Sequence, residues 1–295
     1  HPAVLNTCLY LRDHGYDVTF LPVDEDGMVT PEQVLSAITD KTILISIMFA
    51  NNEIGTIEPI AQIGALAREK GILFHTDAVQ AAGSVPIDVD AMHIDLLSAS
   101  GHKIYGPKGV GMLYIKRGTN IVSQMHGGSH ENRRRAGTEN VPGIVGFGQA
   151  IEIAKAEMEE NASHIRTLRD RLINGIEKEI PFVRLNGHRT NRLPGNVNFS
   201  FEFIEGESLI LMLDMRGIAA STGSACAAGS LEPSHVLLAI GLPHEIAHGS
   251  LRLTLGRRNT ADDVDYAIEQ TKNIVERLRE MSPLFLQKKE VAKHV

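Results

Sequence analysis

Ser98-Ala-Ser-Gly-His-Lys-Ile-Tyr-Gly-Pro-Lys-Gly109 is the stretch around which the rest of the chain is organised. Apolar runs at residues 94–97 and 110–115 flank it, and both are typical of buried strands. Lys103 therefore follows a buried strand directly, although lysines are normally kept on the surface. A site that partly desolvates a lysine turns its amine into a nucleophile suited to Schiff-base chemistry. The alternative is a solvated loop lysine, and the rest of the chain decides between the two.

Composition and charge exclude several classes of function. The 295 residues can form one large domain or two smaller ones, and their net charge of −7 argues against general binding to nucleic acid or anionic membranes. Two cysteines, Cys8 and Cys226, form no disulfide framework, which favours a reducing compartment, here the cytoplasm. No apolar run approaches a membrane span. The chain opens at His1 in mid-pattern, so we expect a front segment to be absent or to lie in another chain.

The first half of the chain alternates between helical and strand patterns. Helical spacing occurs at residues 4–14, 30–38 and 59–70, and strand patterns at residues 17–22, 42–49, 72–75 and 94–97. This order predicts an α/β fold with a mostly parallel, doubly wound sheet. Ligands bind such sheets at the carboxyl ends of the strands, so Asn52, Asp77 and the segment 100–103 become candidate site residues.

The second half predicts a smaller α+β domain. Residues 143–180 are helix-rich and amphipathic, residues 196–203 and 251–255 are strand-like, residues 207–216 are helical, and Thr260 caps a last helix. We expect the polar tail, residues 288–295, to be frayed. The domain boundary is predicted at residue 150, between a large domain (1–150) and a small domain (151–295).

Several side chains suggest chemistry. Asp77 can pair with a buried cation such as a protonated ring nitrogen, or simply cap a helix. Ser100 and His102 can donate to a phosphate, or bond within their loop. Arg252 interrupts an apolar strand with a planar cation suited to a carboxylate, or points away from the core.

The two cysteines have different predicted surroundings. Cys226 lies among small residues between two glycines, which predicts an open loop in which thiolate chemistry is possible. Cys8 lies on the apolar face of a predicted helix and is expected in the core. We predict no metal site, because His244-Glu-Ile-Ala-His248 matches a zinc-protease motif in barely one helical turn and lacks the third histidine.

Taken together, these residues resemble the pyridoxal-phosphate-dependent cysteine desulfurases of the NifS/IscS type. The matching phrases are Asn51-Asn-Glu-Ile-Gly55, His75-Thr-Asp-Ala-Val-Gln80, the stretch 98–109, Arg135-Ala-Gly-Thr-Glu-Asn140, Glu205-Gly-Glu-Ser208, Ser221-Thr-Gly-Ser-Ala-Cys226, Ser230-Leu-Glu-Pro-Ser234 and Leu251-Arg-Leu-Thr-Leu-Gly256. The resemblance implies the fold type I (aspartate-aminotransferase-like) architecture and a homodimer with active sites at the subunit interface.

The resemblance also implies roles for individual residues. Lys103 would hold pyridoxal 5'-phosphate (PLP) through a Schiff base and move the α-proton of L-cysteine, while Asp77 would pair with the ring nitrogen. The remaining cofactor contacts would come from Gln80, Asn52, Ser100, His102, His1 stacked on the ring and assisting proton transfer, and Thr138 of a neighbouring subunit. Arg252, with Asn52 nearby, would hold the substrate carboxylate.

Cys226 would take the sulfur as a persulfide and leave alanine as the product. The sulfur would serve iron–sulfur cluster assembly or thio-modification through a scaffold protein or another acceptor, with Cys226 as a possible transient cluster ligand. Two alternatives stay open. One is a selenocysteine lyase or another cysteine lyase on the same scaffold; the other is a truncated, silent chain that only dimerises or docks a scaffold. The latter is motivated by the family's front segment, with its further phosphate contacts, which does not precede His1.

Overall fold

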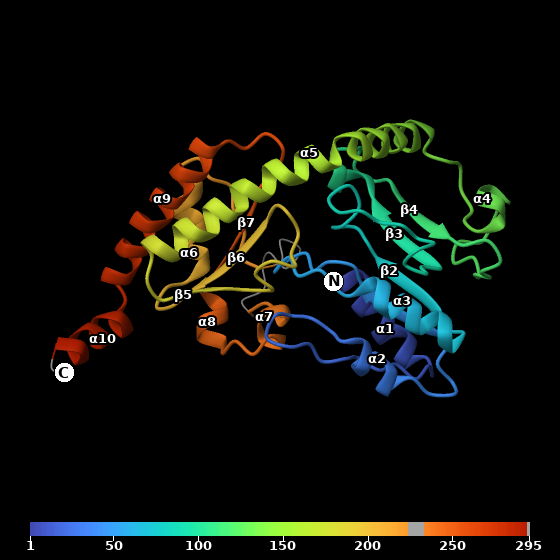
Figure 1. Ribbon diagram of the computed structural model, residues 1–295, viewed down its shortest axis with the longest axis horizontal. Helices are drawn as coiled ribbons and strands as arrows, with labels where there is room; N and C mark the ends of the chain where they lie inside the picture. The colour runs from blue at the N-terminus through green and yellow to red at the C-terminus, as the bar shows by residue number, and fades with distance from the viewer. Residues whose placement is uncertain (224–232, 294–295) are drawn as a thin grey trace. The chain divides into compact units, whose positions relative to one another are not determined.

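The computed structural model of the chain describes residues 1–223 and 233–293, with side chains to residue 288 (Figure 1). The chain forms two compact units. Residues 30–50 and 58–159 make up one, here called the lysine unit, and residues 1–29, 51–57 and 160–295 make up the other, the arginine unit. These units do not coincide with the predicted domains, 1–150 and 151–295, and that division stays a prediction.

The lysine unit is built on a four-stranded sheet in the order β1-β2-β3-β4. Its strands are β1 (Leu44–Met48), β2 (Leu73–Asp77), β3 (Leu96–Ser100) and β4 (Gly111–Ile115). The first three are parallel and β4 is antiparallel to β3, which confirms the mostly parallel sheet. All four strands lie within or beside the apolar runs of the sequence, because a sheet covered on its faces is built from near-continuous apolar segments.

The lysine unit also contains five helical segments among its described residues. They are α2 (Pro31–Ala37), α3 (Ile60–Lys70), the 3-10 helix η1 (Gly101–Ile104), α4 (His130–Arg133) and residues 141–159 of α5 (Val141–Glu179). The α3 helix packs on β2 (Figure 1). A Cβ at Gly64 would lie 2.0 Å from the carbonyl oxygen of Met92, so only glycine permits this approach. Gly71, at φ +68°, ends α3, and the helix therefore stops at the end of the predicted range 59–70.

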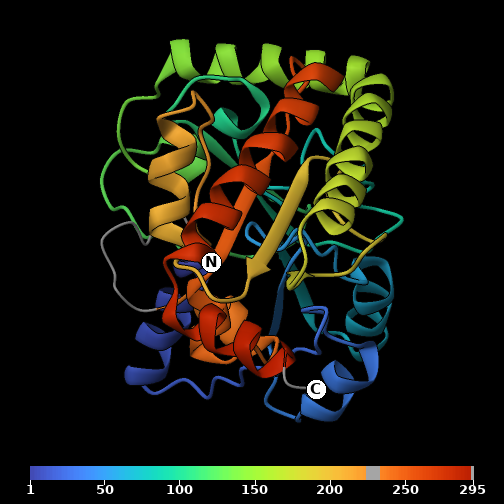
Figure 2. The ribbon, with the colours of Figure 1, turned by 90° about the vertical axis from the view of Figure 1, so that its left-hand side faces the viewer.

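The arginine unit contains an antiparallel sheet, β5-β6-β7, formed by Val183–Leu185, Asn196–Phe201 and Ser250–Thr254. Its helices are α1 (Pro2–Asp13), residues 160–179 of α5, α6 (Gly206–Asp214), α7 (His235–Ala239), α8 (His244–His248), α9 (Ala261–Glu280) and α10 (Pro283–Lys293). The α9 helix lies across the sheet in Figure 2. Its buried Val264, Ile274 and Val275 join Phe199 and Leu251 in one apolar core.

Three local predictions differ from the structure. Residues 17–22 form no strand, because a strand needs paired backbone groups and this run pairs with none of the described strands. Cys8 is only partly buried and does not lie in the core, and no residue of α1 is fully buried. The α10 helix extends to Lys293 into the segment predicted to be frayed.

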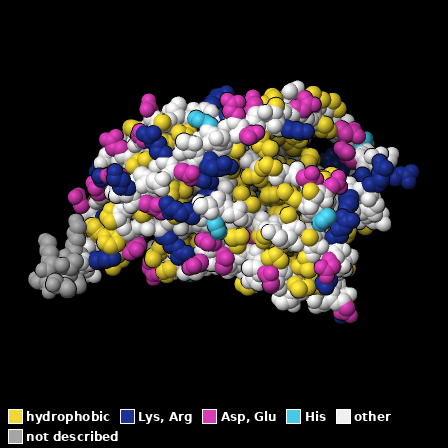
Figure 3. Space-filling view, viewed as in Figure 1, with side chains coloured by type: hydrophobic (Ala, Val, Ile, Leu, Met, Phe, Trp, Pro, Cys, Tyr) yellow, Lys and Arg dark blue, Asp and Glu magenta, His cyan; other side chains and the backbone are white. Residues whose placement is uncertain are grey.

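The surface carries charged side chains of both signs. On the face shown in Figure 3, basic and acidic side chains are interspersed, except near α4, where basic side chains gather. That region carries the run Arg133-Arg-Arg135. Among the described residues, no helix combines the length and apolar character that crossing a bilayer requires.

Strand β6 is buried along its whole length. One of its faces is apolar, and the other carries the polar side chains of Asn196, Asn198 and Ser200. The buried Asn186 donates through Nδ2 to Asn198 Oδ1 and Ser200 Oγ, both at 2.8 Å. Both Asn196 and Asn198 donate to the backbone carbonyl of Glu53, at 3.0 and 3.1 Å. These bonds hold the loop 51–57 against the sheet, because buried polar groups that lose their partners are costly.

Arg192 completes this network. It is 3% exposed, and its Nη2 donates to the carbonyls of Ile54 and Asn186 and to Asn196 Oδ1 at 2.8–3.1 Å. Burial lowers the pKa of this guanidinium to about 10. Among the described residues, Nε and Nη1 of Arg192 have no partner, so Nη2 alone makes the side-chain hydrogen bonds of this buried charge.

We therefore expect Arg192→Leu to lower the free energy of unfolding by about 2–4 kcal/mol, through the loss of three buried bonds. Arg189→Leu is the matched control, since Arg189 is an exposed arginine paired with Glu177, and it should cost less than about 1 kcal/mol. Urea unfolding followed by circular dichroism measures both. Equal losses in the two variants would contradict the assignment.

Candidate active site

Side-chain alternation along β2 and β3 gathers polar groups on one face of the parallel sheet. His75 and Asp77 are two residues apart on β2 and share a face, as do Ser98 and Ser100 on β3. The register pairs Asp77 with Ser98, so the two sets lie on the same face. The carboxyl ends of β2 and β3 therefore present one polar surface, at the edge where the sequence predicts a ligand.

Asp77 is held at the end of β2 in a defined conformation. It is 7% exposed, and its Oδ1 accepts a hydrogen bond from the backbone N–H of Val79 at 3.0 Å. A turn, not a helix, follows it, so the helix-cap alternative is wrong, and the half-buried Gln80 lies in this turn. Within the described part of the chain, Oδ2 of Asp77 has no hydrogen-bond partner. This oxygen is available to a cationic group brought by a ligand.

Lys103 lies in η1, three residues beyond the end of β3. Its side chain is exposed and forms no hydrogen bond or ion pair with the described residues. Close packing fixes the loop beneath it. A Cβ at Gly106 would lie 2.8 Å from the carbonyl oxygen of Gly101, and a Cβ at Gly146 of α5 would lie 2.7 Å from Pro107 Cγ. The loop is thus held by its own backbone and by α5, while the amine of Lys103 stays accessible.

Ser100 and His102 lie on either side of Gly101 at the same edge, and Ser100 Oγ is 2.7 Å from His102 Nδ1. The two residues therefore bond to each other within their loop, as the alternative interpretation predicts. This bond uses Nδ1 of His102 and leaves Nε2 for another partner. Hydroxyl, imidazole and ammonium groups together are donors suited to an anion such as a phosphate. Thr138 is exposed, in the loop between α4 and α5.

The arginine unit brings together two further predicted residues. Arg252 lies on β7 opposite Asn198 of β6, and its Nη1 donates to the backbone carbonyl of Asn52 at 3.0 Å. Asn52 sits in a turn in which Asn51 Oδ1 accepts from the N–H groups of Glu53 and Ile54. Arg252 is half-buried and lies on the face of β7 opposite the core residues Leu251 and Leu253, so it points away from the apolar core, as the alternative interpretation states.

The two remaining predicted residues are His1 and Cys226. His1 is exposed, and its Nδ1 accepts from the N–H of Ala3 at 3.2 Å as the N-cap of α1. Cys226 lies outside the described residues.

The donor set of the lysine unit fits PLP. A buried carboxylate with one unpartnered oxygen suits a protonated ring nitrogen, an accessible lysine amine suits an aldehyde carbon, and Ser100 and His102 suit a phosphate. All of these groups lie at the carboxyl ends of adjacent parallel strands. The fit follows from the chemistry of the residues themselves.

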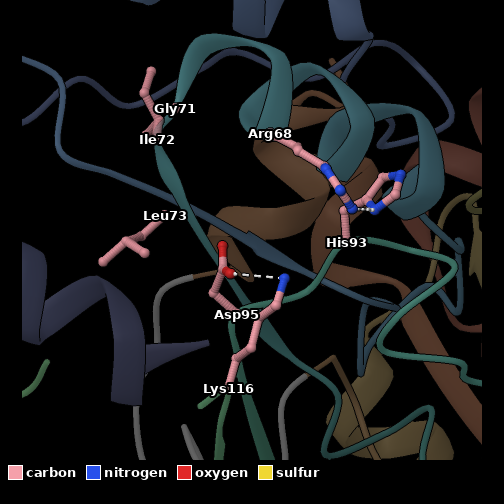
Figure 4. Close-up of a pocket in the computed structure, with 7 residues that line it drawn as sticks. All are labelled: Arg68, Gly71, Ile72, Leu73, His93, Asp95 and Lys116. Atoms are coloured by element: carbon pink, nitrogen blue, oxygen red, sulfur yellow. Dashed lines mark hydrogen bonds and ion pairs between the residues drawn. The ribbon is translucent and has the colours of Figure 1, made fainter. Parts of the chain in front are cut away.

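A cavity of about 220 Å³ lies elsewhere, where β2 begins after α3 (Figure 4). It is lined by Arg68, Gly71, Ile72, Leu73, His93, Asp95 and Lys116. Arg68 donates to His93 Nδ1 at 3.0 Å, and Lys116 pairs with Asp95 at 3.5 Å. The cavity lies at the amino ends of β2 and β3, the opposite end from Asp77 and Lys103, so we assign it no part in the chemistry.

Sequence reasoning did not single out His75, which lies on the same face of β2 as Asp77. It bonds to a serine on each neighbouring strand, and its position two residues before Asp77 was the available signal, because alternate residues of a strand share a face.

Comparisons with known proteins show which proteins the chain resembles. The chain is 62% identical over 284 residues to a protein named cysteine desulfurase IscS from Methanosarcina thermophila, covering 96% of this chain and 70% of that protein. It is 61% identical over 287 residues to a protein of the same name from Clostridium botulinum, covering 97% and 72%. A solved structure titled NifS-like protein superposes with a TM-score of 0.86 at 38% identity, covering 94% and 73%.

The family description Aminotransferase class-V matches residues 1–267, which is nearly the whole chain. The parallel sheet with its lysine and aspartate, the curated relatives and this match lead to one assignment: the chain belongs to the class-V aminotransferase family.

Proposed function

We propose that the chain is a PLP-dependent cysteine desulfurase, which converts L-cysteine to L-alanine and retains the sulfur as a persulfide. The observation that carries this function is the placement of the buried Asp77 and the accessible Lys103 at the carboxyl ends of adjacent parallel strands. The relatives support the same function, because proteins 55–62% identical to this chain are named cysteine desulfurases.

The residues of the lysine unit divide the work of holding the cofactor. When bound, PLP supplies an electron sink for the α-carbon of an amino acid. Asp77 keeps a negative charge against the ring nitrogen, and Lys103 attaches the cofactor and later carries the α-proton. Ser100 and His102 bind the phosphate, and Gln80 contacts the ring oxygen. In this proposal Thr138 of a second subunit adds a phosphate contact in a homodimer, and His1 stacks on the ring.

The arginine unit supplies recognition of the substrate. A guanidinium binds a carboxylate through two parallel hydrogen bonds, and Arg252 is already oriented by its bond to the carbonyl of Asn52. In this proposal the side chain of Asn52 also contacts the substrate carboxylate. A substrate with an α-carboxylate, such as L-cysteine, satisfies this pair.

Cys226 supplies the nucleophile for sulfur. Its thiolate attacks the sulfur of the substrate, the carbon–sulfur bond breaks, and its electron pair returns to carbon. The carbon then takes up a proton, so alanine leaves and a persulfide stays on Cys226. An iron–sulfur scaffold or another acceptor in the cytoplasm then receives the sulfur. Transfer of selenium from selenocysteine by the same residues is the second candidate function. The described residues of the site include none that would discriminate between sulfur and selenium in the substrate.

Lys103→Ala should remove the covalent attachment of PLP. The wild-type chain should be yellow and, after borohydride reduction, yield an adduct on the peptide that contains Lys103. The matched control is Lys108→Ala, an exposed lysine of the same loop, which should leave the adduct in place. Visible absorption and peptide mass analysis measure both, and an adduct that persists in Lys103→Ala would refute the role of this lysine.

Cys226→Ser should abolish the protein-bound persulfide while the bound cofactor keeps its visible spectrum, because the acceptor thiol is lost and the lysine unit is unchanged. Cys8→Ser is the control and should form persulfide normally. Labelling with a thiol reagent after addition of L-cysteine, followed by mass analysis, reports the persulfide. The assignment is wrong if Cys226→Ser releases alanine and sulfide at the wild-type rate.

Arg252→Lys should raise the KM for L-cysteine by roughly 10–100-fold, since a lysine cannot form the two parallel bonds to a carboxylate. The exposed Arg258, in the turn that follows β7, provides the control Arg258→Lys, for which KM should stay within about twofold. Steady-state alanine production measures both values. An unchanged KM in Arg252→Lys would show that the substrate carboxylate binds elsewhere.

A further inference from the structure

We propose that His75 is a positioning residue for PLP, which fixes the carboxylate of Asp77 by joining β1, β2 and β3 through both of its ring nitrogens. This inference rests on the proposed function and adds a residue to it. His75 touches neither the ring nor the substrate in this account; it acts through Asp77.

The hydrogen bonds of His75 link three strands on one face of the sheet. Its Nδ1 lies 2.8 Å from Ser46 Oγ on β1, and its Nε2 lies 3.0 Å from Ser98 Oγ on β3. The register pairs Ser46 with His75 and Asp77 with Ser98, so the three side chains point to the same side. A neutral imidazole has one donor and one acceptor, so one serine donates to it and the other accepts from it.

Because His75 lies two residues before Asp77 on β2, its bonds to β1 and β3 affect the position of the Asp77 carboxylate. Both residues lie on the same face of β2, and His75 is one side-chain step nearer the amino end. Register slips of a strand would turn Asp77 to the opposite face, and side-chain bonds to both neighbours oppose any such shift. The bonds of His75 therefore fix the position of the Asp77 carboxylate along β2 relative to the loop of Lys103, which follows β3.

The electrostatics favour the same role. Burial lowers the pKa of His75, and this effect outweighs the opposing attraction of the Asp77 carboxylate. The imidazole therefore stays neutral at neutral pH and forms no ion pair with Asp77. The negative charge of Asp77 stays available to the ring nitrogen of the cofactor, whereas a protonated histidine on the same face would compete for it.

His75→Phe tests the proposal, because it keeps an aromatic ring of similar shape and removes both bonds. The dissociation constant of PLP should rise by roughly 10-fold or more, and the visible band of the bound cofactor should shift as Asp77 loses its fixed position. His75→Gln, which keeps one donor and one acceptor, should recover part of the affinity. His93→Phe is the matched control, a part-buried histidine of the same unit at the other end of the strands, and should bind PLP as the wild type does.

The readouts are PLP titration of the apoprotein, the visible spectrum, and the melting temperature without PLP. Wild-type affinity and spectrum in His75→Phe, even with a lower melting temperature, would overturn the proposal and leave His75 a purely structural link. Should His75→Phe fail to fold, Ser98→Ala removes one bond only, and a wild-type affinity and spectrum there would overturn it equally. A wild-type chain that binds no PLP would overturn the proposed function itself, which is a different result.

Discussion

The alternation of side chains along β2 is the constraint on which the rest of the site depends. One face of the strand carries Phe74 and Thr76, both fully buried, and the other carries His75 and Asp77. Parallel pairing with β3 then sets the lysine loop beside the carboxyl end of β2. Asp77 and the loop of Lys103 therefore lie at the same edge of the sheet, and a one-residue slip of β2 would turn Asp77 to the face of Phe74 and Thr76.

The arginine unit uses the same alternation for a different purpose. Strand β6 turns Val197, Phe199 and Phe201 into the apolar core and Asn196, Asn198 and Ser200 toward a buried polar network. That network holds the loop 51–57 by its backbone, and Arg252 on the adjacent strand reaches Asn52. Arg252, the arginine that we propose binds the substrate, and the loop it contacts are thus both fixed to one sheet, so their mutual geometry does not depend on flexible connections.

How much the sequence predicts follows from the range of the interactions involved. The four strands of the lysine unit and the placement of Lys103 and Asp77 were predicted and are confirmed, since each depends on local apolar runs and on the general rule for strand ends. The strand β5, three residues long, carries too short a pattern to be recognised. The bonds of His75 to Ser46 and Ser98 span 29 and 23 residues, so only the register of the folded sheet reveals them. Cys226 stays a prediction from the resemblance.

The most direct test of the account is a crystal structure of the chain with PLP bound. Continuous density from the Nζ of Lys103 to the cofactor, with the ring nitrogen within hydrogen-bond distance of the Asp77 carboxylate, is the result that the account predicts. Density for PLP attached to another lysine, or a ring nitrogen directed away from Asp77, would contradict it.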